Sequence, residues 1–143
     1  MDDSATHLTP DLQSSLICDD VRQERNGKFI LIGLFDMIGV PQVPFRYPRI
    51  CTVTRWCSGL GTFTQENRIM RPDQSTPVIS SQPIEISLPN PESVAINVQV
   101  QFNIEFPEVG VYWVETLLDG ELRLRYPLPV HQVVGQRPPT THP

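Results

Sequence analysis

The sequence predicts an all-β protein, a single antiparallel β-sandwich of about eight strands with an immunoglobulin-like general plan. Three observations predict this fold: period-two alternation of apolar and polar residues, two-residue turn signals, and 15 prolines placed between apolar runs. Proline cannot donate to the ladder at a sheet centre or continue a helix, so this spacing favours short strands. A jelly roll is the alternative architecture, because it also consists of many short strands joined by turns.

The first predicted hairpin lies near the start of the chain. The runs SSLICDDVRQE and KFILIGLFD flank Arg25-Asn26-Gly27, and Asn-Gly favours a primed two-residue turn. Because KFILIGL is apolar on both faces, we expect a central strand that is covered on both sides.

The middle of the chain alternates loops and strands. The proline-rich segment 39–48 predicts a crossing loop, and residues 49–57 (RICTVTRWC) and 62–70 (TFTQENRIM) predict strands. Residues 77–88 predict one strand that is broken or bulged at Pro83, since proline cannot pair at a sheet centre.

Residues 94–106 (VAINVQVQFNIEF) carry the clearest strand signal. Strict period-two alternation over this length predicts a long strand with one dry face and one wet face. The wet face carries amides such as Gln99, Gln101 and Asn103. The dry face, expected to point into the core, carries Val94, Ile96, Val98, Val100, Phe102, Ile104 and Phe106.

Residues 110–130 (GVYWVETLLDGELRLRYPLPV) predict the closing hairpin. Asp119-Gly120 is the signal for a type I′ turn, in which both central residues need positive φ. On the first strand Tyr112, Val114 and Leu118 share one face. On the return strand the residues expected on one face are Leu122, Leu124, Tyr126, Leu128 and Val130.

The domain is expected to span residues 12–134, a size at which a chain buries enough surface to fold without metal or disulfide. Residues 1–11 and 135–143 are polar or proline-rich without apolar periodicity, which predicts disordered tails.

Charge and composition argue against several classes of function. With 11 basic and 16 acidic residues the net charge is −5, so we expect no nucleic-acid partner. The longest apolar run, FILIGLF, is too short to span a bilayer, and the acidic start has no apolar core of a signal peptide. We therefore expect no membrane association and a cytoplasmic location.

No cofactor, metal or catalytic site is predicted. The three cysteines show no zinc spacing, and Cys51 and Cys57 would lie roughly 20 Å apart on one strand. Asp19 and Asp20 are adjacent on a strand and so point to opposite faces, which leaves them solvated or paired with Arg22, Arg25 or Lys28. His7 and His142 lie in the predicted tails and His131 follows the last strand, so no spacing indicates a nucleophile and base. An enzyme is therefore not expected.

One predicted contact surface follows from the alternation in residues 110–118. If Tyr112 and Val114 line the core, then Trp113 points outward on the opposite face. Arginines of the return strand would border that face, and Trp and Arg are enriched among binding hot spots. The predicted contact residues are Trp113, Glu115, Leu117, Arg123 and Arg125.

Two resemblances accompany these patterns. The segment 110–130 resembles the final hairpin of immunoglobulin-like and fibronectin-like sandwiches, although the Cys…Trp…Cys framework is absent. The segments ICDDVRQERNGKFILIGLFD, CTVTRW and RIMRPD resemble a family of short bacterial proteins known only as a domain of unknown function. This second resemblance implies a bacterial source, and it suggests no particular activity because none is assigned to that family.

The leading hypothesis is a non-catalytic structural or protein-interaction module, whose partner is another protein or a second copy. The alternative is a carbohydrate- or small-ligand-binding module that uses Trp113 or Trp56, and an enzyme of unknown type is third.

Overall fold

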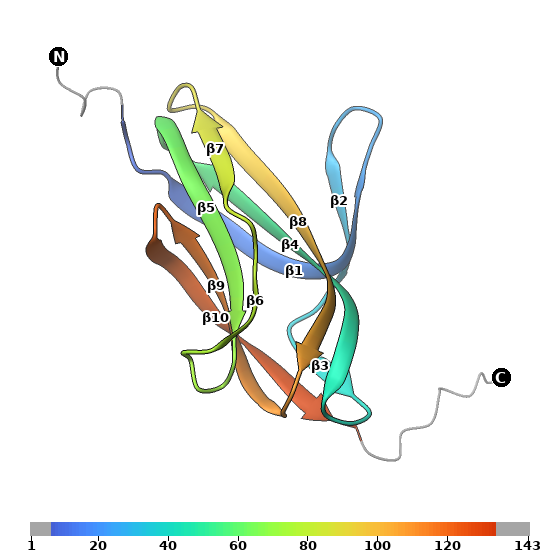
Figure 1. Ribbon diagram of the computed structural model, residues 1–143. Helices are drawn as coiled ribbons and strands as arrows, with labels where there is room; N and C mark the ends of the chain where they lie inside the picture. Colours follow the sequence, from blue (N-terminus) through green and yellow to red (C-terminus); the bar gives the residue numbers. More distant parts are fainter. Residues whose placement is uncertain (1–6, 134–143) are drawn as a thin grey trace.

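A computed structural model describes residues 7–133, which form an all-β domain of two sheets without a helix (Figure 1). The expected all-β class is confirmed, with ten strands in this part of the chain. They are β1 (Asp11–Gln23), β2 (Phe29–Leu34), β3 (Ile38–Val40), β4 (Phe45–Cys57), β5 (Gly61–Met70), β6 (Pro77–Ser80), β7 (Ile84–Leu88), β8 (Val94–Phe106), β9 (Gly110–Leu118) and β10 (Glu121–Gln132).

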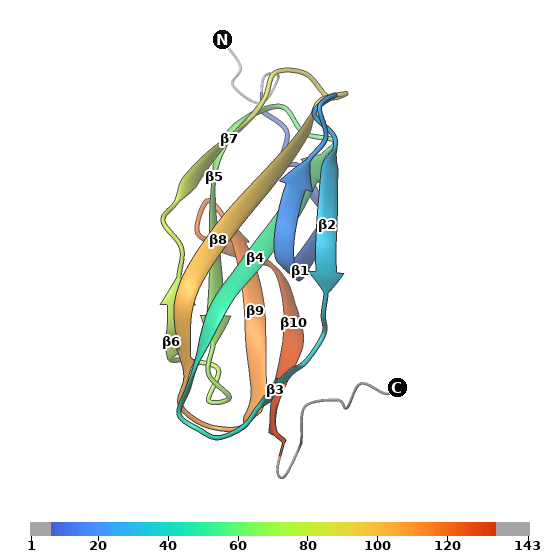
Figure 2. The ribbon, with the colours of Figure 1, turned by 90° about the vertical axis from the view of Figure 1, so that its right-hand side faces the viewer.

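The two sheets lie face to face, as the side view in Figure 2 shows. The four-stranded sheet has the order β2-β1-β4-β8 and is curled like half a barrel. The six-stranded sheet has the order β3-β10-β9-β5-β6, with β7 also paired to β5. Every pairing is antiparallel except that of β3 with β10, so the sequence expectation of an antiparallel arrangement holds for all but this short strand.

Two apolar clusters fill the space between the sheets. The larger joins Ile17 and Phe106 of the four-stranded sheet to Tyr112 and Leu128 of the other sheet, and the Phe106 and Tyr112 rings meet edge to face at 5.0 Å. The smaller cluster surrounds Trp56 at the other end of the domain. Phe106, Tyr112 and Trp56 are fully buried, so these aromatic side chains are main anchors of the core.

A band of polar side chains lies between the sheets beside these clusters. The Gln65 side chain is fully buried, and its Oε1 accepts hydrogen bonds from Trp56 Nε1 at 2.7 Å, Thr54 Oγ1 at 3.1 Å and Asn97 Nδ2 at 3.3 Å. Gln65 Nε2 donates to Asn67 Oδ1 at 3.2 Å. These hydrogen bonds connect β4, β5 and β8, and such a network favours one relative placement of the strands.

The Asn67 side chain extends this band to β9 of its own sheet and to β8 of the facing sheet. Its Oδ1 also accepts from Thr116 Oγ1 at 3.0 Å, and its Nδ2 donates to Gln99 Oε1. Gln99 of β8 therefore points into the sandwich rather than to solvent. The expectation that the amides of β8 form a wet outer face is wrong for Asn97 and Gln99.

The two faces of β8 exchange sides at Asn103. This residue has a φ of 55°, and Pro48 on the adjacent strand, which has no N–H, interrupts the ladder at the same level. Ile104 and Phe106 beyond this point are buried as expected, whereas Phe102 is 63% exposed. The predicted dry face is therefore correct only after Asn103, because the left-handed residue reverses the alternation.

Strand β2 lies at the edge of the four-stranded sheet and, among residues 7–133, pairs only with β1. The expectation of a central strand covered on both sides is wrong. Phe29, Ile30, Ile32 and Leu34 are all 38% exposed or more. A strand with the composition of a buried one is thus left with an open edge.

The turns follow the sequence with one correction. Asp119 and Gly120 have φ values of 50° and 82°, which confirms the type I′ turn. In the first hairpin only Gly27 has positive φ, and the Glu24 N–H donates to the Lys28 carbonyl at 2.7 Å. That hairpin has a three-residue loop ending in a left-handed glycine, not the expected two-residue primed turn. The predicted break near Pro83 is confirmed by the separation of β6 from β7.

Part of the stretch expected as an N-terminal tail contacts the domain. Leu8 forms a β-bridge with Leu60, the His7 ring lies 4.6 Å from the Phe63 ring, and β1 already begins at Asp11. Residues 1–6 and 134–143, which hold the rest of both predicted tails, lie outside the described residues.

Candidate interaction surface

The predicted contact residues lie on the outer face of the six-stranded sheet, where β5, β9 and β10 are neighbours. Tyr112, Val114 and Leu118 are buried in the core as expected, which places Trp113 and Glu115 on the opposite face. Glu115 is nevertheless only 1% exposed, and Leu117 is 6% exposed. The expectation of a wet face is wrong at these two positions, because β9 is a central strand between β5 and β10.

Glu115 is enclosed by two arginines from the adjacent strands. Arg68 Nε lies 2.6 Å from Glu115 Oε1, and Arg125 Nη2 lies 2.8 Å from Oε2. The Arg125 guanidinium also stacks 5.6 Å from the Trp113 ring centre and donates to Gln74 Oε1 at 3.0 Å. Trp113, Glu115 and Arg125 are therefore brought together, but their contacts are mainly with one another and with neighbouring strands.

The electrostatics of this cluster favour the ionised carboxylate. Burial alone raises the pKa of Glu115, but the hydrogen bonds and charges of Arg68 and Arg125 outweigh it, and its pKa lies below the ordinary value of 4.5. Because the pKa is lower in the folded chain than in the unfolded chain, this carboxylate stabilises the fold above about pH 4.5. Its contribution is lost as the pH falls through the folded pKa.

We expect Glu115→Gln to lower the free energy of unfolding at pH 7 by about 3 kcal/mol, because two arginines lose a buried partner. The acid side of the stability curve, measured by urea unfolding from pH 7 down to pH 3, should also become shallower than in wild type. Arg123→Ala, which removes the exposed pair with Glu121, is the control and should change stability by less than about 1 kcal/mol. Equal acid dependence in wild type and Glu115→Gln would show that the carboxylate is not stabilised by folding.

Leu117 and Arg123 do not join this cluster. The β9–β10 register shifts between Leu122 and Leu124, so that Leu122 lies opposite Leu117 and is 47% exposed. Leu122 was expected on the same face as Leu124, and the bulge between them separates the two side chains. Arg123 lies at the bulge and approaches Glu121 at 3.5 Å, with Glu121 largely exposed.

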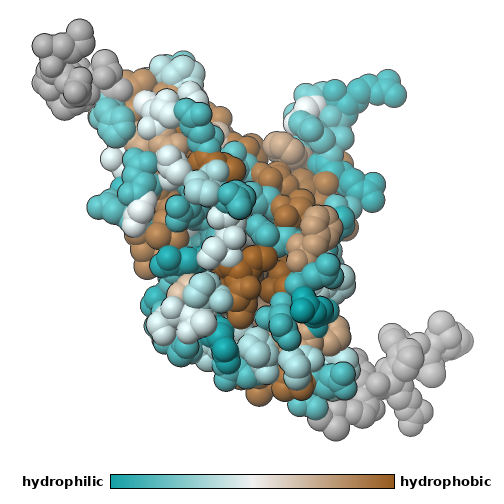
Figure 3. Space-filling view, in the orientation of Figure 1, coloured by the Kyte–Doolittle hydropathy of each residue, from teal (hydrophilic) through white to brown (hydrophobic). Residues whose placement is uncertain are grey.

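A different and more apolar surface occurs on the outer face of the four-stranded sheet. Because the amides of β8 point inward, its branched and aromatic side chains point outward next to those of β4 and β1. Figure 3 shows apolar side chains gathered over these strands, at the base of the projecting β1–β2 hairpin. We call this surface the outer apolar face. Its members are Leu16, Val53, Ile96, Val98, Val100 and Phe102.

The outer apolar face is hollow because the hairpin curls over it. Val21 and Leu31 of the hairpin pack on the buried cluster of Cys18, Cys51 and Val53. Beside this cluster lies a groove of about 520 Å³. Its lining combines apolar side chains with two cations, and includes Leu16, Phe29, Leu31, Ile96, Lys28 and Arg55.

The cysteines of this face are free thiols. Cys18 lies directly opposite Cys51 on the adjacent strand, a proximity that sequence spacing did not indicate. Burial raises the pKa of both thiols, so both are protonated at neutral pH. The residues behave as small apolar side chains of the cluster.

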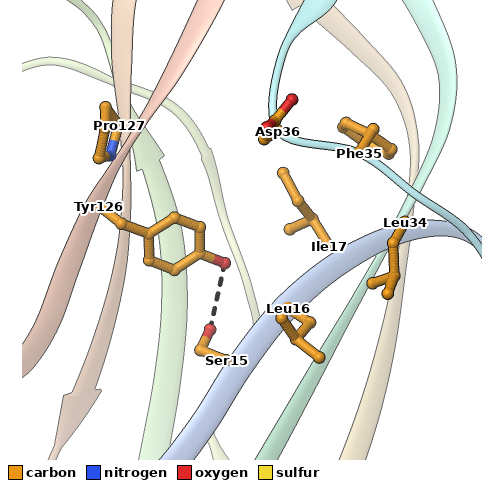
Figure 4. A pocket seen from close by; sticks show the side chains of 8 residues that line it. All are labelled: Ser15, Leu16, Ile17, Leu34, Phe35, Asp36, Tyr126 and Pro127. Carbon is orange, nitrogen blue, oxygen red and sulfur yellow. Dashed lines mark hydrogen bonds between the residues drawn. The ribbon is translucent and has the colours of Figure 1, made fainter.

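A second hollow opens where the two sheets separate, between β1 and β10. It has a volume of about 400 Å³ and is lined by Ile17, Leu34, Phe35 and Pro127 among others. In Figure 4 the Tyr126 hydroxyl points toward Ser15 Oγ, at 3.2 Å, while Asp36 belongs to the opposite wall. Burial raises the pKa of Tyr126, although the Ser15 hydrogen bond opposes this, so the hydroxyl is protonated at neutral pH.

Other candidate motifs are not assembled into a site. Asp20 pairs with Arg22 at 2.8 Å, as expected, and also with Arg49 of β4 at 3.0 Å, which was not expected. Residues 7–133 contain no group of three or more His, Cys, Asp or Glu side chains arranged to hold a metal ion. The same residues contain no helix that could cross a membrane.

The fold and these surfaces define an all-β protein of two packed sheets with an exposed apolar face on the smaller one. A family model described as a family of unknown function, DUF6941, matches residues 13–131, and the chain belongs to this family. The resemblance to a family without assigned activity is thereby confirmed. No curated protein matches the sequence.

The sequence patterns did not predict the outer apolar face as a surface. Its members on β8 were expected in the core, because alternation distinguishes two faces of a strand without indicating which one is covered. One signal was present in β2, because its apolar composition on both faces is typical of a covered strand, and residues 7–133 do not supply that cover.

Proposed function

We propose that this protein is a non-catalytic interaction module that binds another protein through the outer apolar face and the β1–β2 hairpin. The observation that carries this proposal is the exposure of large apolar side chains on one face of the four-stranded sheet. Leu16, Ile96 and Val100 are about 40% exposed, and Phe102 is 63% exposed. Contiguous apolar patches on soluble domains commonly mark contact sites.

The composition of the groove supports a partner with apolar and acidic side chains. Lys28 and Arg55 border the groove, whose walls are otherwise largely apolar. An apolar centre with a charged rim is the usual anatomy of a protein interface. The sequence-predicted surface around Trp113 stays a second prediction of the same class, weakened by the burial of Glu115 and Leu117.

The finer features proposed with this function are an immunoglobulin-like plan and a cytoplasmic location. Tyr112, near the start of β9, donates from its hydroxyl to the Glu108 carbonyl at 2.7 Å, which resembles the tyrosine corner of immunoglobulin-like domains. The free thiols of Cys18, Cys51 and Cys57 are compatible with a reducing compartment.

The hollow in Figure 4 favours a second candidate, a small-ligand-binding module. Its volume of about 400 Å³ and its apolar walls with a pair of hydroxyls resemble those of small-molecule sites. Of the two tryptophans that the sequence suggests for such a module, Trp113 and Trp56, Trp56 is fully buried in the core and cannot stack on a ligand.

The test compares three variants as affinity baits for proteins of the source cell. A partner held by wild type should be lost by Ile96→Ser/Phe102→Ser and retained by Val111→Ser, whose side chain is 41% exposed on β9. With purified components, calorimetry should show at least about a 30-fold loss of affinity for the double variant, as for hot-spot residues. Tyr126→Phe distinguishes the second candidate: loss of binding with this variant alone would assign function to the hollow in Figure 4 and overturn the proposal.

A further inference from the structure

The hollow between β1 and β10 contains a pair of hydroxyl groups with one unused hydrogen. Ser15 Oγ and the Tyr126 hydroxyl oxygen lie 3.2 Å apart, and either hydroxyl can donate to the other. Each hydroxyl carries one hydrogen, so this single bond leaves one O–H without an acceptor. Among residues 7–133 neither hydroxyl has a further hydrogen-bond partner. Because Ser15 is only 9% exposed, an oxygen of a bound molecule would satisfy a donor that the fold leaves unused.

The remaining walls of the hollow are apolar except at one carboxylate. Leu34 and Phe35 line it together with Pro127 of β10. Asp36 is exposed and belongs to the wall opposite the hydroxyl pair (Figure 4). Among the described residues, the lining contains no Lys, Arg or His. The local charge is therefore negative, which favours a cation in the hollow and disfavours an anion.

We propose that this hollow binds a small monoamine, with an ammonium group at one end of an apolar ring or chain and an oxygen at the other. The ammonium group lies beside Asp36, the apolar body contacts Leu34 and Phe35, and the oxygen accepts from the hydroxyl pair. The volume of about 400 Å³ is in the range of small-molecule sites. This inference rests on the second candidate function above and names the class of its ligand.

The first experiment uses tyramine, which carries a phenol hydroxyl and an ammonium group on opposite sides of one ring. Followed by amide NMR signals, tyramine should shift residues of β1, β10 and 35–37, with a dissociation constant on the order of 1 mM for a ligand of this size. Absence of shifts around the hollow would overturn the proposal.

The matched anion is 4-hydroxyphenylacetate, which has a carboxylate in place of the aminomethyl group of tyramine. It should bind at least about 5-fold more weakly, because its charge has the same sign as that of Asp36. Equal or tighter binding of this anion would show that the hollow takes small ligands but that the amine class is wrong.

Tyr126→Phe tests the hydroxyl pair without removing the ring. It should weaken tyramine about 3- to 10-fold, the effect of one neutral hydrogen bond, and leave 2-phenylethylamine, which lacks the phenol hydroxyl, unchanged. Tyr47→Phe is the control, since Tyr47 packs on the core outside the hollow, and it should leave both amines unchanged. Equal weakening of both amines by Tyr126→Phe would overturn the role of the hydroxyl pair.

Asp36→Asn tests the carboxylate. It should weaken tyramine and 2-phenylethylamine alike by about 3- to 5-fold, as expected for an exposed ion pair, and less so at high salt. Glu24→Gln, which removes an exposed carboxylate of the first hairpin, is the control and should change neither affinity. An unchanged preference for tyramine over 4-hydroxyphenylacetate in Asp36→Asn would overturn the role of this carboxylate.

The ligand site and the protein-interaction function fail separately. If tyramine does not bind the hollow and a purified partner is still lost on Ile96→Ser/Phe102→Ser, the amine site is wrong and the interaction function stands. If tyramine binds as expected and that double variant has no effect on any purified partner, the amine site stands without the interaction function.

Discussion

Phe106→Ala should lower the free energy of unfolding by about 3–5 kcal/mol, the range for removing a large aromatic side chain from a packed core. Phe106 is fully buried, and its ring contacts both Tyr47 and Tyr112 edge to face. Urea or guanidinium unfolding, followed by circular dichroism, measures the change. The core between the sheets would lose one of its largest anchors.

Phe102→Ala is the matched control, four residues earlier on the same strand. Because Phe102 is 63% exposed, the substitution should cost less than about 1 kcal/mol, as surface substitutions usually do. The period-two pattern alone predicts similar losses for both positions. A loss at Phe102 as large as that at Phe106 would mean that β8 does not reverse its faces at Asn103.

Gln65→Met should lower the free energy of unfolding by about 3–5 kcal/mol although it nearly conserves volume. The substitution removes the oxygen that accepts from Trp56 Nε1, Thr54 Oγ1 and Asn97 Nδ2. Each buried donor left without an acceptor costs about 1–3 kcal/mol. Gln132→Met, an exposed position on β10, should change stability by less than about 0.5 kcal/mol.

A double-mutant cycle with Trp56→Phe shows whether the hydrogen bonds cause this loss. Trp56→Phe removes the indole N–H, so Gln65→Met should cost about 1–2 kcal/mol less in that background. Additive losses would indicate that Gln65 stabilises the core by packing alone.

Much of the secondary structure is readable from the sequence because its causes are local. The alternation in residues 94–106 and 110–118 depends only on the geometry of an extended chain. The Asp119-Gly120 turn depends only on two residues that tolerate positive φ, and the break at Pro83 on a missing N–H. One ion pair of the first hairpin is also local, since Asp20 pairs with Arg22, two residues later in the chain.

The position and exposure of the candidate surfaces could be predicted from the sequence only in part. Trp113, Glu115 and Arg125 were correctly placed together on one face, because that inference needed only the alternation and the turn between the strands. Their exposure was not predictable. Glu115 is covered because Arg68 arrives from β5, a strand far away in the chain.

The sequence by itself determined that this chain forms strands, where most of them begin and end, and which side chains share a face wherever neither a bulge nor a left-handed residue interrupts the strand. Only the tertiary structure decided which face is covered. On β8 that choice follows from Asn103 and Pro48, which reverse the strand, and from Gln65 and Asn67, which supply partners for inward-facing amides. On β2 it follows from the absence of a further strand beyond the edge of the sheet within the described residues. Burial is a property of neighbours, and the neighbours of a strand come from distant parts of the chain.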